Sequence, residues 1–297
     1  MTLDALRCFC AILDSGSFRA AAEQVHRSQP AVSQQLKNLE RETGHVLLDR
    51  KTCQPTPMGQ LVSERARHIL QEVNALTREL REFDETSVGE LRVGTSDTTA
   101  MYTLPPYVRR FAELMPRVHL VLTNRHSAEI ARQVRQGEIE LGIVTLPLHD
   151  PELEEHRLFE EHLRLVMPAG HALRRRRGLR LEDLHDMPML LLDEGTRTGT
   201  LLRQHFQARG FQPRTVLDSG SFEVIKRYIA EGVGISFLPA SVVTANDGRL
   251  ATREMADLPR VTIGAIRRKG VYRTRAEEAF LGLLRETPSS GDAHGES

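Results

Sequence analysis

The chain has 297 residues, of which 40% are hydrophobic and 27% charged, and its 40 Lys and Arg balance its 40 Asp and Glu. This composition excludes a mainly disordered or low-complexity protein, and the zero net charge gives no sign of a nucleic-acid partner. No apolar run approaches the roughly 20 residues that cross a bilayer, so we expect no membrane contact.

The cysteines and the start of the chain bear on the compartment. Cys8, Cys10 and Cys53 are too few for a disulfide framework. The first residues lack the basic start and long apolar stretch of a secretory signal. We therefore expect a protein of the reducing cytoplasm.

The first 57 residues show short helical patterns with tight connections. Apolar spacing predicts a helix over 3–13 that is broken at Gly16-Ser17. Ser17 is placed to cap a second helix with a small inner face at Ala20–Ala22, and Ser28 to cap a third, which Gly44 ends. Two short helices joined by a tight turn, the second capped, describe a helix-turn-helix.

The third helix has an apolar side and a polar side. Val32, Leu36 and Leu39 repeat at i, i+4 and i+7, and polar residues fill the opposite face. Such a helix can enter the major groove and present side chains to base edges. The candidates are Ser28, Ser33, Gln34 and Gln35 for bases, and Arg27, Lys37, Arg50 and Lys51 for phosphates. The alternative is an ordinary three-helix packing unit with a solvated polar face.

The same segment carries a specific set of motifs. They are Phe9, Gly16–Ala22, Ser28–Glu40, Gly44, Leu47–Arg50 and Thr56–Gly59. This set resembles the winged helix-turn-helix of LysR-type transcriptional regulators. The resemblance implies that Ser28–Lys37 read DNA, that Arg50 holds phosphate at the end of the first wing strand, and that the next turn is the wing. The expected DNA contacts are then Arg27, Ser28, Gln29, Pro30, Ala31, Ser33, Gln34, Lys37, Arg50, Lys51 and Thr56.

The wing departs from the family pattern. The stretch between Arg50 and Thr56 is shorter than usual, and it carries Cys53 and Pro55 where a basic and an apolar residue are common. This departure affects the expected wing contact and leaves the recognition helix untouched.

Residues 58–86 show one long amphipathic pattern. Seven apolar residues step alternately by four and three, namely Val62, Ala66, Ile69, Val73, Leu76, Leu80 and Phe83. An unbroken a/d seam favours pairing with another helix of the same kind over packing on the helix's own core. The resemblance points the same way, because the family's linker helix forms a dimer, and it also implies a tetramer. A dimer would place two recognition helices on two half-sites.

Residues 88–286 alternate strand-like apolar runs with amphipathic helices. The β-α-β-α-β order over 89–144 predicts a mostly parallel sheet, and a second such set follows over 162–238. The first set includes a helix over 127–136 capped by Ser127. A strand over 261–267 and a helix over 275–285 follow. Two lobes joined by crossing strands form a hinge with a cleft, a common place for a small ligand.

This zone resembles the effector domain of the same family, which is similar to periplasmic solute-binding proteins. The supporting stretches are Leu104-Pro105, Phe111–Pro116, Gly137–Ile143 and Glu231–Pro239. The expected fold is α/β with an all-α N-terminal part. The expected domains are a DNA-binding domain (1–57), a dimerisation helix (58–87), an effector domain (88–287) and a disordered tail (288–297). Within the effector domain we expect lobe I at about 88–163 and 267–287 and lobe II at about 164–266.

Ligands of open α/β lobes bind beyond the carboxyl ends of strands, near helix N-termini. The loops that fit carry many hydroxyls and Arg197, which indicates a small anionic or polar ligand, although Asp97 would repel an anion. The alternative is that each Ser or Thr only caps its helix. The resemblance supports Ser96, Ser127 and Thr196–Thr198. The expected effector contacts are Ser96, Asp97, Thr98, Thr99, Ser127, Thr145, Thr196, Arg197, Thr198 and Ser221.

Other signals point to no further chemistry. His149, His156, His162 and His171 lie among acidic residues, but their spacing matches no metal motif, so we expect a solvated loop and sheet edge, no metal and no cofactor. The run Arg174–Arg177 predicts an exposed loop. No Ser-His-Asp set, phosphate loop or zinc spacing has supporting context, so we expect no enzyme. A peroxide switch of the kind some family members use needs cysteines in the effector domain, which has none.

The sequence therefore predicts a sequence-specific transcriptional regulator whose small-molecule effector binds between two lobes. The expected partners are double-stranded DNA, the effector, further copies of the chain as a homodimer or homotetramer, and RNA polymerase. The alternative is a cytoplasmic small-molecule-binding or enzymatic α/β protein whose N-terminal helices serve only for dimerisation.

Overall fold

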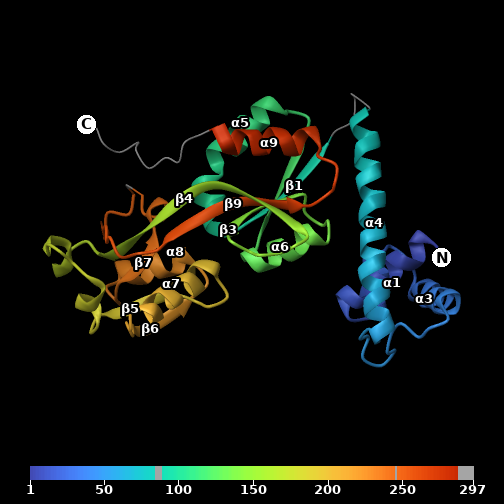
Figure 1. The fold of residues 1–297 in the computed structure, drawn as a ribbon, viewed down its shortest axis with the longest axis horizontal. Coiled ribbons are helices and arrows are strands. Elements are labelled where there is room, and N and C mark those ends of the chain that lie inside the picture. Colours follow the sequence, from blue (N-terminus) through green and yellow to red (C-terminus); the bar gives the residue numbers. More distant parts are fainter. Residues whose placement is uncertain (84–88, 245, 287–297) are drawn as a thin grey trace. The chain divides into compact units, whose positions relative to one another are not determined.

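The structure is a computed structural model that describes residues 1–83, 89–244 and 246–286, with the backbone alone at 78, 79 and 81–83. The chain divides into two compact units, Met1–Ser87 (unit 1) and Val88–Ser297 (unit 2). Unit 1 is built from helices and unit 2 from a sheet with helices around it (Figure 1). The predicted tail over 288–297 lies outside the described residues. Within the described part of the chain, no helix is both long enough and apolar enough to cross a membrane.

Unit 1 contains three short helices and one long one among its described residues. They are α1 (Leu3–Ser15), α2 (Phe18–Gln24), α3 (Gln29–Thr43) and α4 (Pro57–Phe83). The hydroxyls of Thr2, Ser17 and Ser28 cap the first three by accepting the N–H of the third helical residue, at 3.2, 3.1 and 3.4 Å. The predicted caps Ser17 and Ser28 are confirmed. Gly16 and Gly44 end α1 and α3 at φ +66° and +71°, a conformation that favours glycine.

The core of unit 1 gathers apolar side chains from all of its helices and from the segment that follows α3. Phe9, Ile12, Leu36 and Leu39 are fully buried. Leu47 joins them from the segment after α3, so the start of the predicted wing is anchored in this core. Burying a side chain of this size contributes roughly 1.5–3 kcal/mol.

Unit 2 is organised around a mixed sheet. Its strand order is β2-β1-β3-β9-β4-β7, with β8 paired to β4, and β5 and β6 form a separate two-stranded sheet. The bounds are β1 (Glu90–Thr95), β2 (His119–Asn124), β3 (Leu141–Leu146), β4 (Leu153–Pro168), β5 (Pro188–Leu192), β6 (Arg214–Ser219), β7 (Ser236–Pro239), β8 (Leu250–Arg253) and β9 (Arg260–Arg268). β1 pairs in parallel with β2 and β3, and β5 pairs in parallel with β6, as the predicted crossovers require.

Helices connect these strands. They are η1 (Thr99–Thr103, a π-helical turn), α5 (Pro105–Leu114), α6 (Ser127–Arg135), α7 (Arg197–Ala208), α8 (Phe222–Ala230) and α9 (Arg275–Glu286), with the 3-10 turns η2 (Ala172–Arg175), η3 (Leu181–Leu184) and η4 (Ala240–Val242). We call the part around β1–β3 lobe I and the part around β5–β8 lobe II.

The long strand β4 refines one expectation. A solvated loop and sheet edge were predicted around His149 and His156, and residues 147–152 do form a loop. Residues 153–161 form the first half of β4 and pair with β9 alone, so they are an edge of the sheet. The many charges of this half fit a half-exposed strand, because alternate side chains can point to solvent.

The strands β4 and β9 also run through both lobes. Beyond His162, β4 pairs with β7 and β8, whereas β9 pairs with β3 over Thr262–Ile266. The lobe boundary expected between residues 266 and 267 therefore falls inside β9, on the sheet of lobe I.

Candidate functional site

The outer face of α3 is polar and reaches solvent. Gln29, Pro30, Gln34 and Lys37 are exposed, and Ala31 and Ser33 are half-buried. Val32 and Leu36 hold the opposite side in the core with no exposure. The residues that the sequence assigned to base reading thus lie on one accessible helical surface, next to the positive end of the helix dipole.

This surface carries little charge. Residues 28–38 contain one charged residue, Lys37, and no carboxylate of the described residues lies within 4.0 Å of its ammonium. The Gln34 side chain donates a hydrogen bond to Asn38 at 3.0 Å, and the residue remains exposed. Glutamine with an accessible amide can pair with an adenine edge.

Two of the four basic residues expected on phosphates already have carboxylate partners. Arg27 lies 2.7 Å from Asp4, and Arg50 lies 2.9 Å from Glu40. Both guanidinium groups remain nearly half-exposed. Lys51 is exposed at the tip of the wing turn.

The predicted wing is a short hairpin. Leu48 and Pro55 form its bridge, and the amide of Asp49 donates to the carbonyl of Gln54 at 2.9 Å. Arg50 lies in the turn beyond this bridge, not at the end of a strand. Cys53 is buried at φ +54° and closes the turn.

Thr56 has a structural role that its expected place on DNA did not anticipate. Its hydroxyl donates to the carbonyl of Val46 at 2.8 Å and accepts the N–H of Gly59 at 3.0 Å. The first bond ties Thr56 to the segment after α3, and the second holds Thr56 on the first turn of α4. The hydroxyl is therefore engaged within unit 1.

The predicted seam on α4 divides into two parts. Ala66 is buried in the core of unit 1 and Val62 packs against it, because α4 crosses α1 there. Ile69, Leu76 and Leu80 are exposed by 40%, 55% and 63%, and Val73 is half-buried. The side chain of Phe83 lies outside the described residues.

In lobe I, the expected effector residues cluster at the ends of β1 and β3. The Ser96 hydroxyl lies 3.0 Å from that of Thr99 and accepts the Thr99 amide at 3.3 Å. Asp97 is exposed and Thr98 is half-buried. The hydroxyl of Ser127 accepts the amide of Thr145 at 3.3 Å.

Ser127 corrects a second expectation. His126, not Ser127, is the residue before the first turn of α6, and its side chain makes no capping bond. Ser127 is the first helical residue, and its hydroxyl joins α6 to the end of β3 instead. This contact still places Ser127 and Thr145 together.

In lobe II, the expected residues lie at the starts of α7 and α8. Thr196 caps α7 by accepting the Gly199 amide at 3.0 Å, and Ser221 caps α8 through the Val224 amide at 3.5 Å. Thr198 is buried. Helix capping therefore accounts for part of this hydroxyl set, as the alternative reading held.

The two groups of loops meet across the lobes. The guanidinium of Arg197 donates to the carbonyl of Pro147, just beyond β3. A Cβ placed on Gly220 would lie 3.5 Å from the His126 ring. The ends of β3, β5 and β6 and the starts of α6, α7 and α8 thus border one region between the lobes.

Some polar residues in this part of unit 2 were not predicted. Asp193 follows β5 and has a buried carboxylate oxygen without a hydrogen-bond partner in the described structure. Tyr102 of η1 bonds to Glu223 and Lys226 of α8. No local pattern marks Tyr102, because its partners on α8 lie 121 and 124 positions away in the chain.

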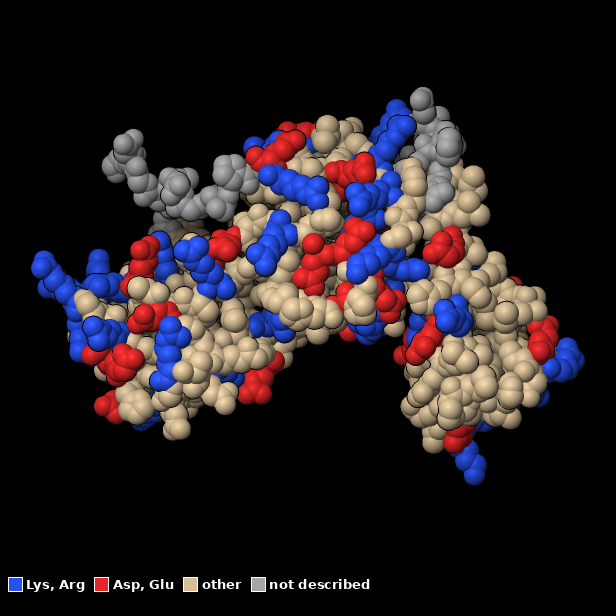
Figure 2. Space-filling model, viewed as in Figure 1, with Lys and Arg blue, Asp and Glu red and all other residues tan. Residues whose placement is uncertain are grey.

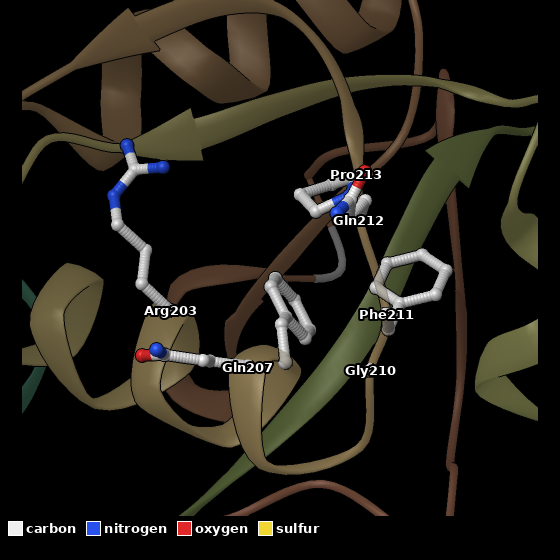
Figure 3. A pocket seen from close by; sticks show the side chains of 7 residues that line it. Arg203, Gln207, Gly210, Phe211, Gln212 and Pro213 are labelled. Carbon is white, nitrogen blue, oxygen red and sulfur yellow. The ribbon is translucent and has the colours of Figure 1, made fainter.

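A separate hollow lies in lobe II at the end of α7 (Figure 3). It is lined by Arg203, Phe206, Gln207, Gly210, Phe211, Gln212 and Pro213. None of the expected effector residues contributes to it, and the Arg203 guanidinium is bound to Asp218 and to the Leu192 carbonyl. We do not assign this hollow to the effector.

The described residues include no group of three or more His, Cys, Asp or Glu side chains placed to hold a metal. On the face that Figure 2 shows, basic and acidic side chains of unit 2 are interspersed, without one continuous field of either sign.

Comparisons with known proteins cover both units. A model described as bacterial regulatory helix-turn-helix protein, lysR family, matches residues 3–60, and a model described as LysR substrate binding domain matches residues 84–289. The probable hydrogen peroxide-inducible genes activator of Streptomyces viridosporus is 32% identical over 96% of this chain and 94% of its own length. The regulator CysL of Bacillus subtilis is 27% identical over 98% of this chain and 99% of its own.

Solved structures agree with these matches. A full-length OxyR variant from Pseudomonas aeruginosa has a TM-score of 0.76 at 27% identity, covering 96% of this chain and 95% of that one. CbnR in complex with its target DNA has a TM-score of 0.65 at 26% identity, covering 96% and 99%. These relatives are transcription regulators and not enzymes, which sets aside the enzymatic alternative. The chain belongs to the LysR family of bacterial transcriptional regulators, and it combines a DNA-binding helix-turn-helix with an effector-binding domain.

Proposed function

We propose that α3 reads one half of an operator through Ser28, Gln29, Ser33 and Gln34. The observation that carries this proposal is the exposed polar face of α3 next to its capped N-terminus. Base edges in the major groove are read by such a face, and amide side chains suit adenine. Pro30 and Ala31 shape the same turn and contact the groove wall.

Phosphate contacts frame this readout. Lys37 and Lys51 supply positive charge directly, whereas Arg27 and Arg50 share theirs with Asp4 and Glu40. Phosphate contacts fix register and supply affinity that falls with salt, but they carry no sequence information. Thr56 contributes to the phosphate contacts indirectly, because it holds the segment beside the wing in place.

The functional assembly is a homodimer joined along α4. Exposed Ile69, Leu76 and Leu80 provide the surface, since apolar residues at heptad spacing are buried by a second helix. Half-buried Val73 continues this surface, and the heptad spacing of the sequence extends the proposal to Phe83, whereas Val62 and Ala66 belong to the core of unit 1. A tetramer and a contact with RNA polymerase are further proposals that rest on the family alone.

Unit 2 takes a small polar effector between its lobes. The supporting arrangement is the convergence of the Ser96–Thr99 loop, Ser127, Thr145, the Thr196–Thr198 turn and Ser221 around one region. An effector that binds one arrangement of the lobes more tightly than another would shift the population of the protein that binds DNA.

We also propose the division of the chain into a DNA-binding domain (1–57), a dimerisation helix (58–87) and an effector domain (88–287). The proposed site of action is the cytoplasm, because a bacterial regulator meets its operator there.

Affinity selection of fragmented genomic DNA by the full chain tests the proposal. We expect enrichment of sites with a partly palindromic core at about physiological salt, because two α3 helices of a dimer face two half-sites. Absence of enriched sites, with and without a metabolite extract, would contradict it.

A reporter gene placed beside an enriched site then tests the effector region. Replacing Thr98 and Ser127 together by Ala should abolish the response to the extract and leave DNA binding intact. An unchanged response would remove the assignment of these loops.

A further inference from the structure

Lys226 is a buried cation with a complete set of partners. Its side chain is 7% exposed on α8, and its ammonium lies 3.0 Å from the Tyr102 hydroxyl, 3.2 Å from Glu223 and 3.1 Å from Asp247. An ammonium has three N–H donors, so three oxygens satisfy it fully.

One of these partners comes from the other lobe. Glu223 and Asp247 belong to lobe II, like Lys226 itself, but Tyr102 belongs to η1 of lobe I. The Tyr102 hydroxyl also donates to Glu223. The tyrosine ring packs against a lobe II cluster that includes Val166, Leu190 and Ile225, so polar and apolar contacts coincide.

The pKa shifts of these side chains favour the protonation states that the hydrogen bonds require. Burial lowers the pKa of Lys226, but the hydrogen bonds that its ammonium donates to Tyr102, Asp247 and Glu223 outweigh burial, and the net result is a raised pKa. Burial and the hydrogen bond to Glu223 raise the pKa of Tyr102. Burial raises the pKa of Asp247, but its bonds to Thr244 and Lys226 outweigh burial and lower it. At neutral pH the group therefore holds an ammonium, a neutral phenol and an Asp247 carboxylate.

Separating the lobes would break this set. Tyr102 would leave with lobe I, and a buried ammonium would lose one of its three acceptors. A buried charge without its partners is costly, whereas an exposed ion pair contributes little. The contact therefore favours the spacing of the lobes seen here.

The same residues adjoin the proposed effector region. Tyr102 follows the Ser96–Thr99 loop directly, and Glu223 and Lys226 lie in the first turns of α8, which Ser221 caps. A ligand that moves either loop would act on the contact through one or two turns of helix.

We propose that Tyr102, Glu223, Lys226 and Asp247 form an inter-lobe latch that controls how readily the two lobes separate and so regulates access to the effector region. The role of the latch in regulation rests on the proposed function, in which the effector binds between the lobes. Hinged lobes of this kind exchange between open and closed forms, and a contact present in one form sets their ratio.

Distance measurements between spin labels on the two lobes of the full-length chain test the latch. Labels at Arg109→Cys on α5 and Gln204→Cys on α7 occupy exposed helical sites. Cys8, Cys10 and Cys53 are buried, and protein without the added cysteines gives the background labelling. Dilution with unlabelled protein removes distances between subunits. We expect Tyr102→Phe, which keeps the ring and removes the hydroxyl, to broaden the inter-lobe distances and lengthen their mean.

The control is Tyr228→Phe, which removes the hydroxyl of an exposed tyrosine on α8, the helix that carries Lys226, and should leave the distances unchanged. Lys226→Met should broaden the inter-lobe distances as much as Tyr102→Phe does. The double variant should broaden them no further than either single variant, because both changes break the same contact. Unchanged distances in Tyr102→Phe, or broadening by both tyrosine variants alike, would overturn the latch. The measurement uses neither DNA nor effector, so a failure to bind operators cannot be mistaken for a failure of the latch.

Discussion

The guanidinium of Arg50 lies 2.9 Å from one carboxylate oxygen of Glu40, and the other oxygen of Glu40 accepts the N–H of Leu47 at 3.0 Å. One carboxylate near the end of α3 thus binds both the start and the turn of the wing. It fixes the wing against the recognition helix, and it lowers the positive charge that Arg50 offers to DNA.

Arg50→Ala should weaken binding to operator and unrelated DNA by the same factor. Removal of one phosphate contact reduces the slope of log K against log salt by about 1 without changing specificity. Titrations at several salt concentrations measure both effects, with Arg109→Ala on α5 as the control. Glu40→Gln should do the opposite, because the amide can still accept the Leu47 N–H while its charge is gone. Weaker binding by Glu40→Gln would contradict this account of the pair.

Gly59→Ala should unfold unit 1 or displace its wing. A Cβ at Gly59 would lie 1.9 Å from the carbonyl oxygen of Leu47, which also accepts the Thr56 amide. Overpacking of this kind costs roughly 1–3 kcal/mol or more, and here backbone must move. Differential scanning calorimetry and DNA binding measure the loss.

The matched control is Gly282→Ala on α9, where a Cβ meets open space. Alanine is favoured over glycine inside a helix by about 0.5–1 kcal/mol, so this variant should be as stable as the parent or slightly more so. Equal thermal transitions for both alanine variants would show that Gly59 is not constrained.

The helix ends of unit 1 could be predicted because their signals are local. Ser17 and Ser28 precede apolar repeats, and a cap needs only the three residues that follow it. The α4 seam was predicted as one stripe, but Ala66 packs on α1, which the spacing could not reveal. Periodicity marks an apolar face and does not say what covers it.

In unit 2 the failures came from contacts between distant residues. The Ser127 hydroxyl binds Thr145, 18 positions away, so the rule that places Ser before a helix led to the wrong residue. The short strand β8 and the pairing of residues 153–161 with β9 depend on partners about a hundred positions away. The sequence indicated which loops carry the candidate effector residues, because each loop follows a strand or begins a helix. In the structure these loops lie around one region between the lobes.

Leu76→Lys should convert dimers into monomers and abolish tight operator binding, since a charge would be buried at the centre of the proposed helix pair. Asn74→Lys, which adds the same charge at another exposed position of α4, should leave the dimer intact. Sedimentation velocity separates the two forms. If Leu76→Lys dimerises over the same concentration range as the parent chain, this surface of α4 is not the dimer interface.

Hydrogen peroxide should leave operator affinity unchanged, in contrast with what the name of the Streptomyces relative suggests for that protein. All three cysteines lie in unit 1 and are buried. Burial raises the pKa of Cys10 to about 11 and that of Cys8 above its ordinary value. With a pKa of 11, about one Cys10 thiol in ten thousand is ionised at pH 7, and the thiolate is the reactive form. A change in affinity that a thiol reductant reverses would refute this prediction.

The most direct test of DNA reading by α3 compares the sites selected by the parent chain with those selected by Gln34→Ala. Gln204→Ala, on an exposed position of α7, is the control. Loss of a base contact costs about 1–3 kcal/mol of discrimination at one base pair. The account predicts that the Gln34 variant selects the same core with one position relaxed in each half-site, while the control selects the parent's motif. An identical motif for the parent and Gln34→Ala would contradict it.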